Sequence, residues 1–170
     1  MKKILLAAIM ALGFGASSVS ASDLIGGMNI GYTNMDIGGV SGNGGHLGYD
    51  FGIPIFTEDK NGFNVGAEIE LQWVVMDDST NVDSSVGGAT GGLFIGYYKD
   101  GFWGRVGGDY QYLAITDSAY VSGFVPNIRA GWDFSDRFGV EVSYKTGTLD
   151  LNGDGPGVDV DTIGISLTIH

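Results

Sequence analysis

The segment from Phe63 to Trp73 constrains this chain most, because its odd-numbered positions are apolar and its even-numbered positions are polar or glycine. Side chains alternate between the two faces of a β-strand, so the segment predicts a strand with one apolar and one polar face. About ten residues, tilted at about 45°, cross the apolar band of an outer-membrane barrel. The segment therefore predicts a membrane-spanning strand, with a half-buried strand of a soluble β-sandwich as the alternative.

The same alternation recurs along the rest of the chain. It is found near residues 24–33, 47–55, 93–97, 102–112, 124–134, 138–145 and 162–169. No charged residue stands on the apolar face of these segments, whereas the opposite face holds charges of both signs. In a soluble sandwich the apolar face is the interior, and the outer face carries Lys and Glu freely. We therefore expect an all-β fold, an eight-stranded antiparallel up-and-down transmembrane β-barrel.

The first residues have the pattern of a secretory signal peptide. Met1-Lys2-Lys3 is basic, residues 4–14 are apolar, and Val19-Ser20-Ala21 is a small-residue cleavage site. We expect a signal peptide over residues 1–21 and a single barrel domain over residues 22–170. The chain has no cysteine, so no disulfide contributes to the fold.

The expected connections differ in length. Short turns near 57–62, 99–101 and 135–137 alternate with longer segments near 34–45, 77–86, 117–120 and 150–158. In outer-membrane barrels the short turns are periplasmic and the long loops extracellular, so we expect both termini in the periplasm. Aromatic residues form two predicted girdles, which are Phe63, Tyr97, Phe102, Phe134 and Phe138 near the turns, and Tyr32, Trp73, Tyr112 and Tyr144 near the loops.

Over residues 22–170 this pattern resembles the small eight-stranded outer-membrane barrels of the OmpA-transmembrane and OmpX type. The resemblance implies a monomer in outer-membrane lipid of a Gram-negative bacterium. It also implies periplasmic chaperones and the barrel-assembly machinery as partners during biogenesis. Such proteins usually end in an aromatic residue, whereas this chain ends in His170, so its assembly signal departs from the family pattern.

Charged residues on the polar face predict a network inside the barrel. An eight-stranded barrel is just wide enough for its own side chains, so we expect these charges to plug it with salt bridges; an ion path is the alternative. Carboxylates outnumber the cations, so Asp50 is expected near a wetted mouth. The predicted network consists of Glu68, Glu70, Arg105, Asp109, Arg129, Asp133, Glu141 and Lys145.

An enzymatic function is the least favoured alternative. His46 and Asp78-Ser79 faintly resemble the His, Asp and Ser set of the lipid A palmitoyltransferase PagP. That chemistry needs an apolar hydrocarbon pocket inside the barrel, and a charged lumen argues against one. We expect no catalysis, and we expect His46 to be a polar residue of the rim.

The outer loops are acidic, and the formal net charge of the chain is −12. Such a surface repels nucleic acids and acidic glycans, and contact with lipopolysaccharide phosphates would need bridging divalent cations. We therefore expect a structural or adhesin-like surface role through these loops, with a narrow porin-like channel as the main alternative. The loop acids, which no Lys or Arg accompanies, are Asp36, Asp77, Asp78, Asp83, Asp117, Asp150, Asp154 and Asp159.

One acidic loop predicts a calcium site. Residues 150–161 follow the pattern D-x-[DN]-x-[DN]-G with an acidic residue at the twelfth position, which supplies hard oxygen ligands. An Asp/Asn/Gly turn without metal is the alternative. The expected ligands are Asp150, Asn152, Asp154, the carbonyl of Pro156 and Asp161. No other cofactor is expected.

Overall fold

The computed structural model describes residues 25–55, 61–77, 84–115, 119–153 and 155–170. In this part of the chain no helix is long and apolar enough to cross a membrane. The predicted signal peptide over residues 1–21 lies outside the described residues and stays a prediction. The strands are β1 (Ile25–Ile37), β2 (Val40–Pro54), β3 (Gly62–Met76), β4 (Ser84–Lys99), β5 (Phe102–Ala114), β6 (Tyr120–Asp133), β7 (Phe138–Leu151) and β8 (Gly157–Ile169).

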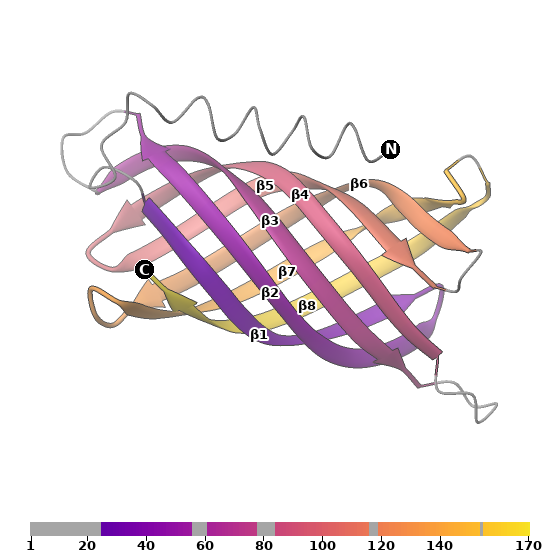
Figure 1. Cartoon of the computed structure of the whole chain (residues 1–170). Coiled ribbons are helices and arrows are strands. Elements are labelled where there is room, and N and C mark those ends of the chain that lie inside the picture. Colours follow the sequence, from indigo (N-terminus) through magenta and orange to yellow (C-terminus); the bar gives the residue numbers. More distant parts are fainter. Residues whose placement is uncertain (1–24, 56–60, 78–83, 116–118, 154) are drawn as a thin grey trace.

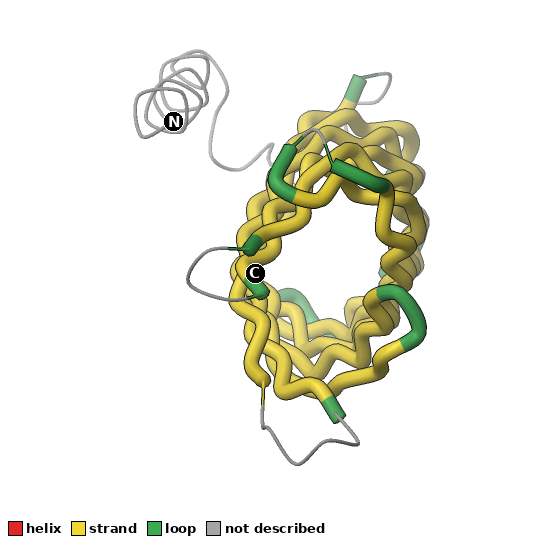
Figure 2. Tube along the Cα trace, turned by 90° about the vertical axis from the view of Figure 1, so that its right-hand side faces the viewer, coloured by secondary structure: helices red, strands yellow, loops and turns green. Residues whose placement is uncertain are grey.

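The eight strands form one closed antiparallel barrel, as the sequence predicts (Figures 1 and 2). Each strand pairs with the next along the chain, and β8 pairs with β1 from Met28↔Ile169 to Ile37↔Val160. Closure leaves no sheet edge, so strand backbone groups can find partners within the sheet. This arrangement allows the outer wall to be apolar.

The two ends of the barrel carry different connections. We call the end with the β4–β5 and β6–β7 connections the turn end, and the end with the β1–β2 and β7–β8 connections the loop end. In Figure 1 the turn end is on the left, together with the C-terminus. His170 N–H donates to the carbonyl of Arg137 there, at 3.0 Å. The two ends give the positions of all sites described below.

The connection expected over residues 34–45 is much shorter in the structure. Strands β1 and β2 continue to Ile37 and from Val40, so only Gly38 and Gly39 form the turn. Their φ angles are 59° and 88°, in the left-handed region that glycine adopts without strain and that tight hairpins require. The expectation of a long loop here was wrong, because the polar residues on both sides of the turn pair with each other and extend β1 and β2.

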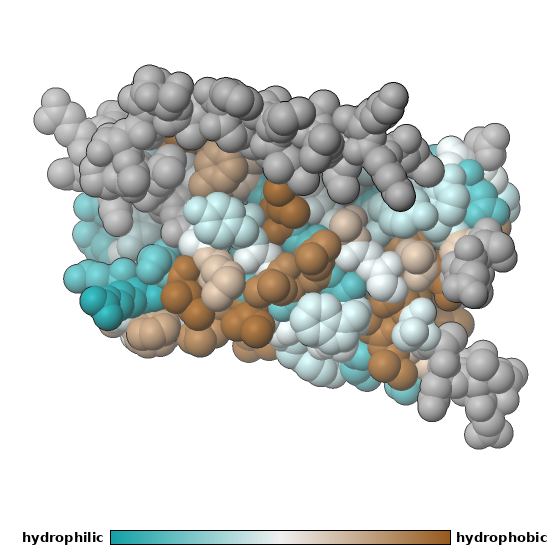
Figure 3. All heavy atoms as spheres, viewed as in Figure 1, coloured by the Kyte–Doolittle hydropathy of each residue, from teal (hydrophilic) through white to brown (hydrophobic). Residues whose placement is uncertain are grey.

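The outer wall is an apolar band bounded by aromatic rings. Figure 3 shows apolar side chains crossing the middle of the described surface. At the turn end Phe63 packs edge-on against Tyr97, with ring centroids 5.1 Å apart. Nearer the loop end Tyr112 stacks on Tyr120 at 4.9 Å. Exposed apolar residues from every strand thus form a continuous lipid-compatible surface, with amphipathic rings near its borders.

Candidate functional site in the barrel lumen and at the loop end

Arg129 lies at the centre of a buried ion network in the middle of the lumen. Its guanidinium contacts three carboxylates, at 3.0 Å from Glu68, 3.1 Å from Glu70 and 2.8 Å from Glu141. Strand alternation turns all of these side chains inward, because each occupies an inward position of β3, β6 or β7. The Arg129 side chain is only 2% exposed, so these contacts replace its lost hydration.

Lys145 extends this network toward β5. Its Nζ lies 3.1 Å from Glu70 and 3.0 Å from Asp109. The Asn127 amide donates to Glu68 at 2.8 Å and to Asp109 at 2.6 Å, and so links the two groups of carboxylates. The structure therefore brings six of the predicted network residues together, and it adds Asn127, which the sequence analysis missed because it selected only charged residues.

Arg105 belongs to a separate contact group closer to the turn end. It forms an ion pair with Asp50, and its guanidinium lies 4.5 Å from the Phe94 ring centroid and 4.3 Å from that of Trp103. Both rings point inward and are buried. Asp50 is 3% exposed, so the expectation of a wetted position for it was wrong. The cation that pairs with Asp50 is Arg105 on β5, and the count of charged residues in the sequence does not show this pairing.

Asp133 forms a third group at the turn end itself. Its Oδ1 lies 3.0 Å from His170 Nε2 and accepts a hydrogen bond from the Trp103 indole N–H at 3.2 Å. His170 therefore ties the end of the chain to β6. The predicted network is thus spread along the lumen in three groups, with Arg129 and Lys145 in the middle, Arg105 closer to the turn end, and Asp133 at the turn end itself. The Trp103 side chain contacts both Arg105 and Asp133.

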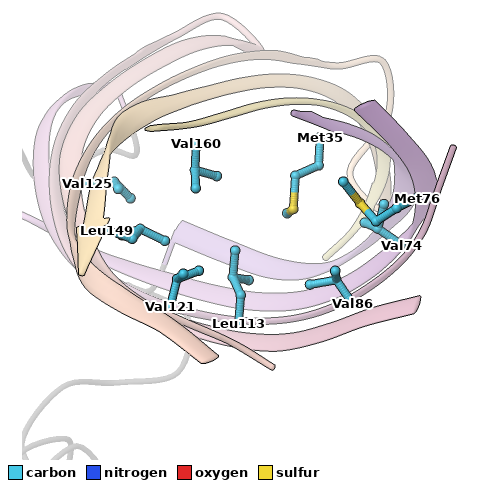
Figure 4. Packing of buried hydrophobic residues seen from close by; sticks show 9 residues of the cluster. All are labelled: Met35, Val74, Met76, Val86, Leu113, Val121, Val125, Leu149 and Val160. Carbon is cyan, nitrogen blue, oxygen red and sulfur yellow. The ribbon is translucent and has the colours of Figure 1, made fainter. Parts of the chain in front are cut away.

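The loop-end third of the lumen is apolar, which the sequence analysis did not predict. Inward side chains from seven strands point into the lumen here and are at most 6% exposed (Figure 4). We call them the loop-end apolar cluster; it consists of Met35, Val74, Met76, Val86, Leu113, Val121, Val125, Leu149 and Val160. Together with the ion network, this cluster closes the lumen in two chemically different zones.

Around the loop-end apolar cluster, the outer face of β1, β2, β7 and β8 is polar. Outward positions that are apolar in the middle of these strands become polar toward the loop end, as at Asn34, Ser41, Thr148 and Asp159. An apolar interior beneath a polar exterior is the arrangement of a water-soluble barrel. This side of the barrel therefore continues beyond the apolar band, with the loop-end apolar cluster as its core.

The predicted calcium ligands are partly engaged in other contacts. Asn152 Oδ1 accepts from the Tyr120 backbone N–H at 3.2 Å, and the Pro156 carbonyl accepts from Leu151 N–H at 3.3 Å. Asp161 lies within β8 and accepts from the Tyr144 hydroxyl at 3.1 Å. The Asp150 side chain is exposed, and Asp154 lies outside the described residues. Among the described residues, no group of three or more His, Cys, Asp or Glu side chains is arranged to hold a metal ion. The calcium site stays a prediction.

No protein-family model matches the sequence, and no curated protein matches it. Solved structures do match. Ail, the attachment invasion locus protein of Yersinia pestis, in complex with the heparin analogue sucrose octasulfate, superposes with a TM-score of 0.56 at 13% identity, over 85% of this chain and 96% of Ail. Neisserial surface protein A gives a TM-score of 0.57 at 8% identity, over 88% of this chain and 98% of that protein. The chain has the fold of a small outer-membrane β-barrel.

Within this outer-membrane barrel fold, His46 does not lie at the rim as expected. It is on β2, faces the lumen and is 2% exposed. Its ladder partners are Gly31 and Gln72, which carry neither a carboxylate nor a hydroxyl group. Asp78 and Ser79, the other members of the PagP-like set, lie outside the described residues. The expectation of a rim position was wrong because β2 extends well beyond His46.

Proposed function

We propose that this protein is a surface-interaction protein of the bacterial outer membrane, adhesin-like and non-catalytic. In this proposal the turn end and both termini face the periplasm, and the loop end faces the outside of the cell. The protein acts as a monomer in outer-membrane lipid. Residues 1–21 direct export, and periplasmic chaperones and the barrel-assembly machinery handle the chain before insertion.

The observation that carries this proposal is the acidic rim at the loop end, which comprises Asp36, Asp150, Asp159 and Asp161. Asp36 is partly exposed and the other three are exposed. The side chains that contact Asp36, Asp159 and Asp161 are neutral hydroxyls, from Ser41, Thr148 and Tyr144. None of the described Lys or Arg residues lies at this end. The carboxylates therefore keep their negative potential for an external partner.

The sign of this charge indicates the kind of partner. Ail was solved with a heparin analogue, which is a polyanion. The acidic rim of this chain would repel such a ligand unless divalent cations intervened, and it favours cationic peptides or basic protein surfaces. The proposed partner is therefore basic. The two closed zones of the lumen support a binding role over the narrow-channel alternative, since neither zone leaves an aqueous path of porin type.

Binding of a defined cationic probe tests the proposal. The barrel is placed in lipid nanodiscs and titrated with fluorescent decalysine at low and physiological salt. We expect saturable binding that weakens with salt and weakens at least tenfold in the variant Asp36→Asn/Asp150→Asn/Asp159→Asn/Asp161→Asn. The matched control is Asp100→Asn/Asp136→Asn, which removes two exposed acids at the turn end.

Two results would reject the proposal. One is equal binding of decalysine to the rim variant and to the parent. The other is tighter binding of fluorescent heparin than of decalysine without added divalent cations.

A further inference from the structure

The ladder between β6 and β7 is interrupted in its loop-end half. Pairing holds at Val121↔Leu151 and Ser122↔Asp150 and resumes at Asn127↔Lys145 in the same register. Between these positions, residues 123–126 of β6 are not register partners of residues 146–149 of β7, although both segments pair with their other neighbours, β5 and β8. The other seven ladders run without a break through their paired residues. We call residues 123–126 and 146–149 the β6–β7 seam.

Pro126 explains part of this interruption. Asp133 N–H donates to Gly101 on the β5 side, and the Tyr120 carbonyl accepts from Asn152 on the β7 side. Backbone groups alternate along a strand, so the even-numbered residues of β6 direct theirs toward β7. Pro126 is one of these residues, and it has no N–H to donate. The sequence thus prevents the seam from forming a complete ladder.

The strands nevertheless remain close together at the seam. A methyl group on Gly147 would lie only 2.8 Å from Val125 Cγ1, and one on Gly123 would lie 3.1 Å from Leu149 Cδ2. Side-chain packing therefore keeps the strands together where the ladder is incomplete. Separating the strands here breaks fewer ladder bonds than separating a stretch of the same length in the other described ladders, because Pro126 has no N–H to donate to β7.

Apolar surfaces lie on the inside of the seam and, on the outside, next to it. On the inside, Val125 and Leu149 belong to the loop-end apolar cluster. On the outside, a hollow of about 380 Å³ lies over β6, β7 and β8, where Ile128, Tyr144 and Ile163 contribute to its walls. Ile128 and Tyr144 are register partners close to the seam, on its turn-end side. The hollow is part of the lipid-facing wall, so hydrocarbon chains are its natural neighbours.

We propose that the β6–β7 seam is a lateral binding site for the hydrocarbon chain of a small uncharged amphiphile. The chain enters from the outer hollow, parts β6 from β7, and packs against Val125 and Leu149. The charge beside the seam sets the class of ligand. Asp150 is the register partner of Ser122 next to the seam. On β8, Asp159 is the register partner of Thr148, and Asp161 is the register partner of Thr146. These carboxylates repel an anionic head group and tolerate a hydroxyl.

A covalent lock tests whether the seam must open. The chain contains no cysteine, so Phe124→Cys/Thr148→Cys places a single pair of thiols on outward positions that face each other in the register. The control Tyr110→Cys/Phe124→Cys joins register partners of the uninterrupted β5–β6 ladder. Each oxidised protein is placed in nanodiscs with ¹³C-labelled Val and Leu methyl groups, titrated with 1-decanol, and measured by NMR.

We expect saturable shifts of the Val125 and Leu149 methyl signals in the parent and in the oxidised control, and their loss in the oxidised seam variant. Reduction should restore them. Sodium decanoate should bind at least tenfold more weakly than 1-decanol. Absent shifts in the parent, or unchanged shifts in the locked seam, would overturn the lateral site, and equal binding of decanoate would overturn the assigned ligand class.

Hydrogen exchange tests the seam without any ligand. The amides of Phe124 and Thr148 face the seam and should exchange at least tenfold faster than those of Ile128 and Tyr144, where pairing has resumed. Exchange at the same rate as in the flanking ladder would mean that the seam is held like the rest of the wall, and the proposal would then be wrong.

Discussion

Arg129 Nη1 lies 2.8 Å from Glu141 Oε1, and the two side chains are 2% and 0% exposed. A charge pair so deeply buried requires both partners, because either one alone would remain in the lumen without compensation. The same guanidinium also serves Glu68 and Glu70 from β3. Arg129 therefore joins opposite walls of the barrel.

Replacing Arg129 should destabilise the barrel. For Arg129→Ala we expect a loss of about 3–5 kcal/mol in the free energy of unfolding, since three carboxylates lose their shared cation. Urea titration in lipid vesicles measures this loss. Arg137→Ala, an exposed change in a turn, is the control and should alter stability by less than about 0.5 kcal/mol. A neutral Arg129→Ala variant would mean that water already screens the network.

A charge on the apolar band should be costly. Leu93 is 69% exposed on β4 and is the register partner of Ala67, near the middle of the wall. We expect Leu93→Arg to cost about 2–4 kcal/mol of unfolding free energy in vesicles, because the guanidinium must enter hydrocarbon. Val40→Arg, beside the Gly38-Gly39 turn, is the matched control and should cost about 0–1 kcal/mol. Equal costs for the two variants would place the band elsewhere.

The turn-end group around Asp133 should contribute to stability. Asp133→Ala removes the acceptor of the Trp103 indole N–H and one contact of His170, and we expect a loss of about 1–3 kcal/mol. The exposed Asp136→Ala variant is the control. Thermal unfolding followed by gel-shift assay compares the two variants. Identical melting of both proteins would show that Asp133 is merely a solvated acid of the mouth.

The lumen should not conduct ions at porin size. The ion network fills its middle, and the loop-end apolar cluster closes the third at the loop end. Planar-bilayer recordings of the purified barrel should show no steady open level. Large and stable conductance steps from a monomer would contradict the plugged lumen and would return the channel alternative to first place.

The calcium prediction applies only at high concentration. If the loop over residues 150–161 binds Ca²⁺ as an extracellular site, the dissociation constant should be about 10⁻⁴–10⁻³ M. Calorimetry on the folded barrel, compared with Asp150→Ala/Asp154→Ala, measures this. Indistinguishable responses of parent and variant to millimolar Ca²⁺ would identify the loop as an ordinary turn.

The sequence alone determined the strands, the antiparallel closed barrel and the inward direction of the charged side chains. It could do so because a period of two assigns each residue to a face without knowledge of its neighbours. The segment Phe63–Trp73 already contains this information, and the recurrence of the pattern supplied the number of strands.

Only the tertiary structure decided which inward groups meet. Arg129 contacts Glu68 from β3 and Arg105 contacts Asp50 from β2, and the shear and closure of the barrel set these pairings, which no local pattern encodes. The apolar core at the loop end and the seam beside Pro126 also required the structure. Both depend on where the strands end and how they pair, and sequence periodicity is least informative there.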